Sequence, residues 1–99
     1  MRTIIWSPQA EAELAEILTY FEEQNAGSNI YTAYLLGKID DVSARFIQSP
    51  ALGQKIGEGE DRYFRIDHLL FVYSEVENGI EISTVWDGRR DPKTLKLTR

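Results

Sequence analysis

Two consecutive segments with helical periodicity constrain the fold of this chain more than any other feature of its sequence. The first begins at Ser7-Pro8, where serine can cap free amides and proline suits the first helical position, and it runs to about Asn25. The second begins at Ser28 or Asn29 and ends before Pro50, because proline disfavours the helical conformation in the preceding residue. The apolar stripes of the two segments consist of Ala10, Leu14, Ile17, Leu18 and Phe21, and of Tyr31, Leu35, Ile39, Val42 and Phe46. The short link predicts an antiparallel helical hairpin, in which neither helix can bury its stripe on the other alone.

Short apolar segments around the helical pair indicate strands. These segments are Thr3–Trp6, Tyr63–Ile66, Leu69–Tyr73 and Ile80–Trp86. A glycine-rich loop over residues 51–61, a tight turn at Asp67-His68 and the hairpin signal Asn78-Gly79 separate the last three of them from one another and from the second helix. The predicted order is β-α-α-β-β-β. This order is typical of an α+β fold of two layers, with the helical hairpin packed on an antiparallel sheet.

Composition favours one small domain without a metal or a cofactor. The 99 residues are 42% hydrophobic, which is enough for a single core, and we expect one domain over residues 1–99. The chain has no cysteine and His68 is its only histidine, so thiolate sites and histidine clusters are excluded. No apolar run has the length of a membrane span, and the N-terminus lacks a signal-peptide pattern. We therefore expect a cytoplasmic protein that needs no metal, cofactor or membrane.

The charge of the chain is unevenly distributed. Its formal net charge is −5; residues 1–61 hold 4 basic and 10 acidic side chains, whereas residues 62–99 hold 7 basic and 6 acidic ones. Proteins that bind nucleic acid usually carry an extended basic surface, because neutralised phosphates supply much of the affinity. The basic residues here are enough for a local patch only. Direct binding to nucleic acid is therefore not expected.

A pair of arginines follows the last predicted strand. Arg89 and Arg90 stand where that strand stops, so a rigid scaffold would hold them while they reach outward. They could pair with Asp87 and Asp91 and fasten the chain end, and surface ion pairs of that kind stabilise by only about 0–1 kcal/mol. They could instead bind a partner. We favour partner binding, because a local double positive charge is unusual in so acidic a chain.

Other candidate residues also have two interpretations. Arg65 lies in a strand among apolar neighbours, and it either points from the open face of the sheet or pairs with a carboxylate such as Asp67 or Glu81. Trp86 is expected to pack, but at a strand end it could also anchor a partner, since tryptophan is enriched in binding hot spots. Tyr73 is expected to be half-buried rather than catalytic, and His68 to be solvated in its turn.

Several short motifs occur in a fixed order along nearly the whole chain. They are Trp6-Ser7-Pro8 before an acidic helix, Ser49-Pro50-Ala51-Leu52-Gly53, Arg62-Tyr63-Phe64-Arg65, Phe71-Val72-Tyr73 and Gly88-Arg89-Arg90-Asp91-Pro92. Together they resemble the motifs of the RelE/ParE superfamily, the toxins of type II toxin–antitoxin pairs, and most closely those of its ParE-like branch. The resemblance implies a toxin that a cognate antitoxin neutralises in a toxin–antitoxin hetero-oligomer. Such an antitoxin could lay an amphipathic helix in an apolar groove beside the helical hairpin, or add a strand to a sheet edge.

The resemblance implies different actions for different branches. ParE-like toxins inhibit DNA gyrase by protein binding, whereas RelE-like toxins cut mRNA on the ribosome, which requires a base, cations and an acid. No tyrosine or histidine follows Tyr73, and Trp86-Asp87 stands where related nucleases often carry a histidine. We therefore expect a non-catalytic gyrase inhibitor, with no catalytic residue assigned. Its expected target-binding residues are Arg65, Trp86, Arg89 and Arg90. An endoribonuclease and a non-toxic antitoxin-binding module are the alternatives.

Overall fold

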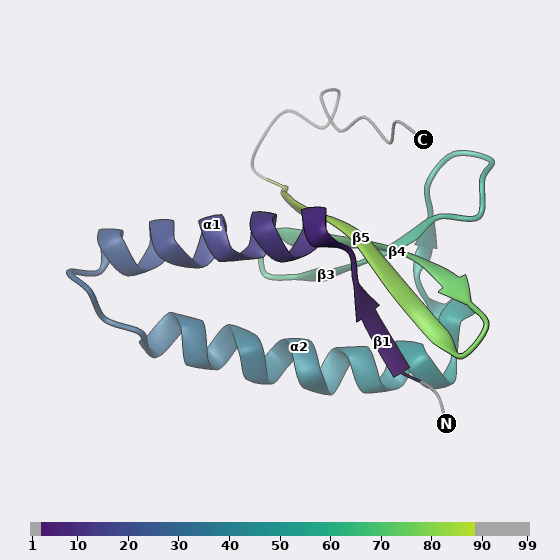
Figure 1. Cartoon of the computed structure of the whole chain (residues 1–99), viewed down its shortest axis with the longest axis horizontal. Coiled ribbons are helices and arrows are strands. Elements are labelled where there is room, and N and C mark those ends of the chain that lie inside the picture. The colour runs from purple at the N-terminus through teal and green to yellow at the C-terminus, as the bar shows by residue number, and fades with distance from the viewer. Residues whose placement is uncertain (1–2, 89–99) are drawn as a thin grey trace.

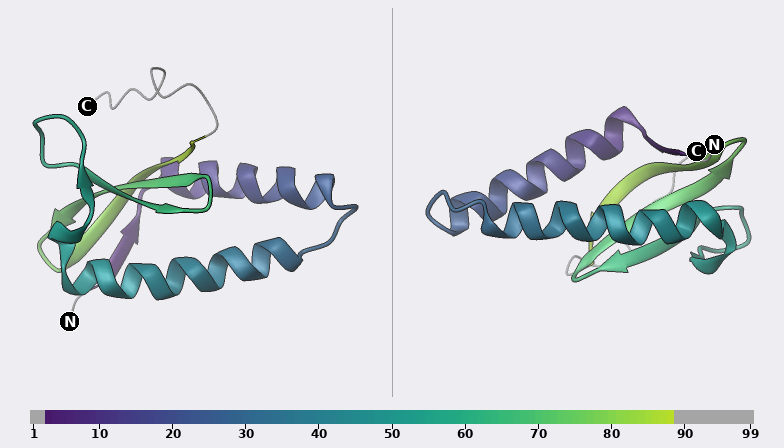
Figure 2. Two further views of the ribbon diagram at one scale, coloured as in Figure 1. Left: turned by 180° about the vertical axis from the view of Figure 1, so that it is seen from behind. Right: turned by 90° about the horizontal axis from the view of Figure 1, so that it is seen from below.

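A five-stranded sheet and a helical hairpin form the two layers of the computed structural model, which describes residues 3–88 (Figure 1). The elements are β1 (Thr3–Trp6), α1 (Pro8–Gln24), α2 (Ile30–Gln48), the 3₁₀ helix η1 (Pro50–Leu52), β2 (Gln54–Lys55), β3 (Arg62–Ile66), β4 (Leu69–Val76) and β5 (Gly79–Asp87). The strand order in the sheet is β1-β5-β4-β3-β2. Both helices lie on the same side of this sheet (Figure 2).

The predicted α+β fold class is confirmed, and the structure adds two features to it. The sheet is mixed rather than antiparallel, because β1 pairs in parallel with β5. Within the segment predicted to be a loop, Gln54–Lys55 forms the additional strand β2, which pairs with the first two residues of β3. A strand of two residues is too short to produce a periodic pattern, so the sequence carried no signal for it.

The helices begin and end close to the predicted positions. At the start of α1, Ser7 Oγ accepts a hydrogen bond from the Ala10 amide at 3.0 Å. The same hydroxyl donates to the Ser83 carbonyl at 2.9 Å, so one side chain both caps α1 and ties it to β5. At the start of α2, Ser28 Oγ accepts from the Ile30 amide at 3.3 Å. Ser7 is thus the N-cap of α1, as predicted. The N-cap of α2 is Asn29, whose side chain makes no capping hydrogen bond, and Ser28 precedes it.

The core lies between the helical hairpin and the sheet, where the predicted apolar stripes meet the strands. Its central feature is a stack of aromatic rings: Phe64 lies 5.0 Å from Phe71 and 4.8 Å from Phe46, measured between ring centroids. The buried members of the core are Ala10, Leu35, Ile39, Phe64, Ile66, Leu69, Phe71, Tyr73, Ile80, Ile82 and Val85. The helices therefore cover one face of the sheet and leave the other face without a helical layer.

Glu13 supports the part of β5 that extends beyond β1. The pairing with β1 stops at Ile82, which leaves the following residues of β5 without a neighbouring strand on that side. Glu13 Oε1 accepts hydrogen bonds from the Val85 amide at 2.9 Å and from Thr84 Oγ1 at 2.6 Å. One glutamate on the acidic face of α1 thus satisfies a backbone donor that would otherwise lack a partner strand.

Tyr73 fixes the turn that precedes β2. Its side chain is fully buried rather than half-buried; the hydroxyl donates to the Pro50 carbonyl at 2.6 Å and accepts from the Gly53 amide at 2.9 Å. Arg62 Nη1 donates to the Gly53 carbonyl at 2.7 Å. Burial raises the pKa of Tyr73 above its usual 10.0, against the lowering effects of the Gly53 amide and the Arg62 charge. The hydroxyl therefore keeps the proton that it donates at neutral pH.

This contact makes Gly53 sensitive to substitution. A Cβ atom at Gly53 would lie 2.2 Å from the Tyr73 hydroxyl oxygen, so Gly53→Ala must displace the ring or the turn. We expect a loss of roughly 2–4 kcal/mol in the free energy of unfolding, from overpacking and broken hydrogen bonds. Gly37→Ala is the matched control, because its Cβ would meet nothing within 4 Å on α2. Urea unfolding should show Gly37→Ala at or above wild-type stability; equal stabilities for the two variants would contradict this role of the turn.

Candidate functional site

The strand register brings Arg65 and Trp86 together on one face of the sheet. Arg65 of β3 is paired with Leu70 of β4, and Leu70 is paired with Trp86 of β5. Residues paired directly across neighbouring strands point to the same face. The adjacent row, Phe64, Phe71 and Val85, is buried under the helices. Because side chains alternate along a strand, the row of Arg65, Leu70 and Trp86 lies on the face opposite the helical hairpin.

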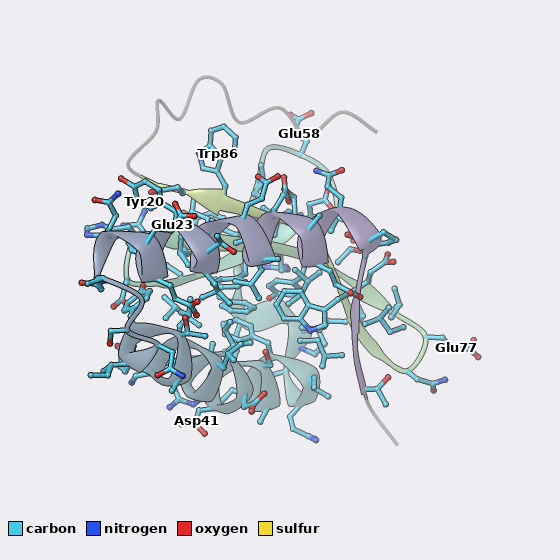
Figure 3. All side chains as sticks on the ribbon, turned by 60° about the vertical axis from the view of Figure 1, so that its left-hand side comes forward. Tyr20, Glu23, Asp41, Glu58, Glu77 and Trp86 are labelled. Atoms are coloured by element: carbon cyan, nitrogen blue, oxygen red, sulfur yellow. The ribbon has the colours of Figure 1, made fainter. Side chains whose placement is uncertain are left out.

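A hollow of about 290 Å³ surrounds this row; we call it the open-face site. Its lining residues are Lys55, Ile56, Tyr63, Arg65, Leu70, Trp86 and Gly88. Figure 3 shows the Trp86 side chain projecting from β5 away from the helical layer. The site combines two cations with aromatic and aliphatic surface, and among residues 3–88 no acidic residue lines it.

The cations of the open-face site are available to a partner. Arg65 is exposed, and within residues 3–88 the side chains of Arg65 and Lys55 form no ion pair or hydrogen bond. Of the two interpretations of Arg65, the structure supports the one in which it points from the open face. Tyr63 is oriented by a 2.5 Å hydrogen bond from its hydroxyl to Gln54 Oε1. An anionic group or a hydrogen-bond acceptor could therefore bind Arg65 without breaking an ion pair or a hydrogen bond between Arg65 and any of residues 3–88.

Arg89 and Arg90 lie outside the described residues. Gly88, which precedes them, lines the open-face site and donates from its amide to the His68 carbonyl at 2.5 Å. The backbone of His68, an exposed residue in the β3–β4 turn, thus fixes the last described residue of the chain. The two arginines follow directly in sequence.

The sequence interpretation named only Arg65 and Trp86 among the residues that line the open-face site, and it missed the two other polar members, Tyr63 and Lys55. Tyr63 could have been found, because it stands two residues before Arg65 in the same strand and so shares its face. Lys55 could not, because it lies in a segment without any periodic pattern and reaches the site only through β2. Its position depends on the turn that Tyr73 and Arg62 hold.

A second hollow lies between α1 and α2, and we call it the helical groove. Its volume is about 390 Å³, and its lining residues are Trp6, Glu11, Leu14, Ala15, Leu18, Leu36, Ile39 and Asp40. The lining is mostly apolar, and Leu36 is 44% exposed although it is a large hydrophobic residue. The two acidic residues give the groove a negative character. This combination suits the apolar face of a helix flanked by basic residues.

Other kinds of site are not found in the described part of the chain. Between residues 3 and 88, no group of three or more histidine, aspartate or glutamate side chains is arranged to hold a metal ion. None of the helices there is long and apolar enough to cross a membrane.

A family model matches most of the chain. The family model described as the ParE toxin of type II toxin-antitoxin system, parDE, matches residues 4–92. The matched region includes the open-face site, the helical groove and the two arginines after Gly88. The search of curated proteins found no match.

Proposed function

Because this chain belongs to the ParE toxin family of type II toxin–antitoxin systems, we propose that it inhibits DNA gyrase by binding it through the open-face site. The observation that carries the proposal is the row of Arg65, Leu70 and Trp86 on the sheet face that the helices leave open. Arginine and tryptophan are the residues most enriched in binding hot spots, and aliphatic neighbours exclude water around them. Arg89 and Arg90 are proposed to extend the same surface. Because DNA gyrase acts on the chromosome in the cytoplasm, the proposed inhibition is cytoplasmic.

The open-face site supports binding better than catalysis. Cleavage of mRNA requires a base and an acid next to the cations that stabilise the phosphate. In the described part of the chain the lining offers Lys55, Arg65 and the Tyr63 phenol, without a carboxylate or an imidazole. An acidic protein is also repelled by the dense phosphate of a ribosome unless the face that it presents is strongly basic. We therefore propose that the toxin acts without chemistry of its own.

Gyrase inhibition in cells can be tested through DNA topology. Induction of the chain without its antitoxin should arrest growth and relax a reporter plasmid, because gyrase maintains negative supercoiling. Primer extension on abundant transcripts should show full-length mRNA in the same cells. If the mRNA were cut at specific sites and the plasmid topology stayed normal, the chain would be an endoribonuclease instead. Normal growth with both readings unchanged would identify a non-toxic module.

The helical groove is the proposed site of antitoxin binding. Its apolar floor can receive the anchors of an amphipathic helix, and Glu11 and Asp40 would attract basic flanks on that helix. Among residues 3–88, the groove and the open-face site share no lining residue. We propose that the antitoxin helix folds on binding and stabilises the toxin.

Substitution in the groove should weaken this protection. At a free antitoxin concentration of 100 times Kd, binding stabilises the toxin by about 2.7 kcal/mol. Leu36→Glu places a charge on the apolar floor and should remove most of the rise in melting temperature caused by the protein encoded next to this gene. Ile30→Glu, at a residue 78% exposed and outside the groove, is the control and should keep the full rise. If that protein did not raise the melting temperature of the wild type, it would not be the antitoxin of this toxin. If it raised the melting temperatures of both variants equally, the antitoxin would bind outside the helical groove.

A further inference from the structure

A row of aromatic side chains crosses the end of the helical hairpin from α1 to α2. The ring centroids of Tyr20 and Phe21 lie 5.7 Å apart, those of Phe21 and Tyr31 4.7 Å, and those of Tyr31 and Tyr34 5.9 Å. Phe21 and Tyr31 are partly buried, whereas Tyr20, at the α1 end of the row, is 54% exposed. An exposed tyrosine ring offers flat apolar surface and also attracts cations to its face. Tyr20 therefore keeps more than half of its surface open to a further contact.

The exposed side chains beside Tyr20 are acidic. Glu16 and Glu23 stand four residues before and three residues after Tyr20 on α1, so they share its side of the helix. We call Glu16, Tyr20 and Glu23 the tyrosine face. Both glutamates are exposed, and within residues 3–88 neither side chain forms an ion pair or a hydrogen bond. Helix α1 contains no basic residue, and Glu23 lies in its last turn, where the partial negative charge of the helix end repels a carboxylate. The tyrosine face therefore attracts a cationic ligand.

The chain itself supplies a basic segment that begins close to the aromatic row. Residues 89–99 hold one acidic residue and five basic ones, which are Arg89, Arg90, Lys93, Lys96 and Arg99. This segment follows Gly88, whose amide donates to the His68 carbonyl. Asp67, the residue before His68, accepts a 3.2 Å hydrogen bond from the Tyr31 hydroxyl. The segment thus starts beside the turn that contacts the row.

The length and the composition of the segment suit the tyrosine face. Its 11 residues can span up to about 36 Å when extended. The path from Gly88 to Tyr20 is shorter, because it leads through one turn and the neighbouring rings of Tyr31 and Phe21. Leu95 and Leu97 stand on either side of Lys96, so the segment offers apolar side chains as well as charges.

We propose that residues 93–99 bind to the tyrosine face of the same molecule. The basic side chains of this segment lie against Glu16 and Glu23, and its leucines cover the Tyr20 ring. The contact holds residues 89–92 between two fixed points, Gly88 and the tyrosine face. A segment of another protein would have to compete with this tethered one, whose effective concentration is in the millimolar range. This inference concerns a surface distinct from the helical groove and the open-face site, and it does not depend on the action against gyrase.

The test places a nitroxide spin label near the end of the full chain and records amide signals by nuclear magnetic resonance. The chain has no cysteine, so Thr98→Cys creates a single labelling site. We expect the label to broaden the signals of residues 16–23 and to lower their intensity by about half or more, because the short tether favours the bound form. In about 1 M sodium chloride the Debye length is only about 3 Å, so the broadening should disappear.

Two reversals of charge show whether the contact is specific to the tyrosine face. Glu23→Lys should remove most of the broadening, and it should keep the fold because a lysine suits the end of a helix. Asp41→Lys is the matched control, since it makes the same change at an exposed residue of α2, and it should broaden the signals as the unmodified sequence does. Circular dichroism compares the folding of the two variants.

A mixture of two samples identifies the molecule that supplies the segment. Spin-labelled chain without isotopes is mixed with isotope-labelled chain that carries no nitroxide, and we expect no broadening in this mixture. Broadening of residues 16–23 in the mixture would assign the contact to a second copy and overturn the inference. Signals that keep their full intensity in the singly labelled chain, or equal broadening in Glu23→Lys and Asp41→Lys, would overturn it as well.

Discussion

Replacement of Gly79 by alanine is expected to destabilise the fold more than the same replacement at any other glycine among residues 3–88. Gly79 has φ = 151°, and a Cβ atom there would lie 1.8 Å from the Thr3 carbonyl oxygen and 2.8 Å from the Thr3 amide nitrogen. Both are backbone atoms of β1, which cannot move without separating from β5. At the residue before Gly79, the Asn78 carbonyl accepts a 2.6 Å hydrogen bond from the Thr3 amide.

Separation of β1 from the sheet would also remove its side chains from the core. Ile4 and Trp6 pack against the core, and the Trp6 ring lies 6.3 Å from that of Phe71 in an edge-to-face arrangement. We expect Gly79→Ala to lower the free energy of unfolding by roughly 3–5 kcal/mol, from backbone strain and lost packing. Small domains have only about 5–15 kcal/mol in total. Much of the variant should therefore be unfolded at physiological temperature.

Gly59→Ala provides the control for this prediction. Its Cβ would meet nothing within 4 Å, so the variant should unfold like wild type. Circular dichroism during urea titration compares the two variants directly. If Gly79→Ala unfolded at the same urea concentration as Gly59→Ala, the close parallel pairing of β1 with β5 would not contribute to the stability of the fold.

Reversal of charge at Arg65 is expected to remove toxicity and leave the fold intact. Arg65 is exposed and its side chain has no partner among residues 3–88, so Arg65→Glu should cost little stability. A hot-spot residue contributes at least about 2 kcal/mol to binding, and a repulsive charge adds to the loss, so affinity should fall by about 100-fold or more. Growth arrest should then disappear at expression levels at which wild type is toxic.

Two other variants distinguish this effect from a general change of charge or fold. Trp86→Ala removes the aromatic member of the same row and should also abolish growth arrest, with some loss of stability because Trp86 is partly buried. Lys38→Glu makes the same change of charge on α2, away from the open-face site, and should arrest growth like wild type. If Arg65→Glu were as toxic as Lys38→Glu, Arg65 would not belong to the surface that binds the target.

Local sequence patterns were sufficient to predict the helices and the order of the elements other than η1 and β2. The apolar stripes set the faces of α1 and α2, and Ser7 and Pro50 marked the start of one helix and the end of the other. That Arg65 and Trp86 share a face follows from alternation along strands once the β3–β4 and β4–β5 pairings are known. The sequence offered both as candidates but could not place them side by side.

The features that the sequence did not reveal depend on contacts between distant segments. Strand direction is not encoded in an apolar run, so the parallel pairing of β1 was not apparent. Asn78-Gly79 correctly indicated a hairpin, yet the turn itself contains Glu77 and Asn78, and Gly79 is the first residue of β5. Glycine is required at position 79 by the close approach of the Thr3 backbone as well as by the turn. Likewise, the helical groove is formed by elements that the sequence could not position relative to one another.

Purified DNA gyrase provides the most direct measurement of the central claim, that this toxin acts by binding gyrase through the open-face site. Gyrase is incubated with relaxed plasmid, ATP and increasing amounts of the chain, and supercoiling is followed on agarose gels. We predict that wild type and Lys38→Glu inhibit supercoiling and that Arg65→Glu does not. Supercoiling unaffected by wild type, together with site-specific cleavage of ribosome-bound mRNA in primer extension, would contradict the claim.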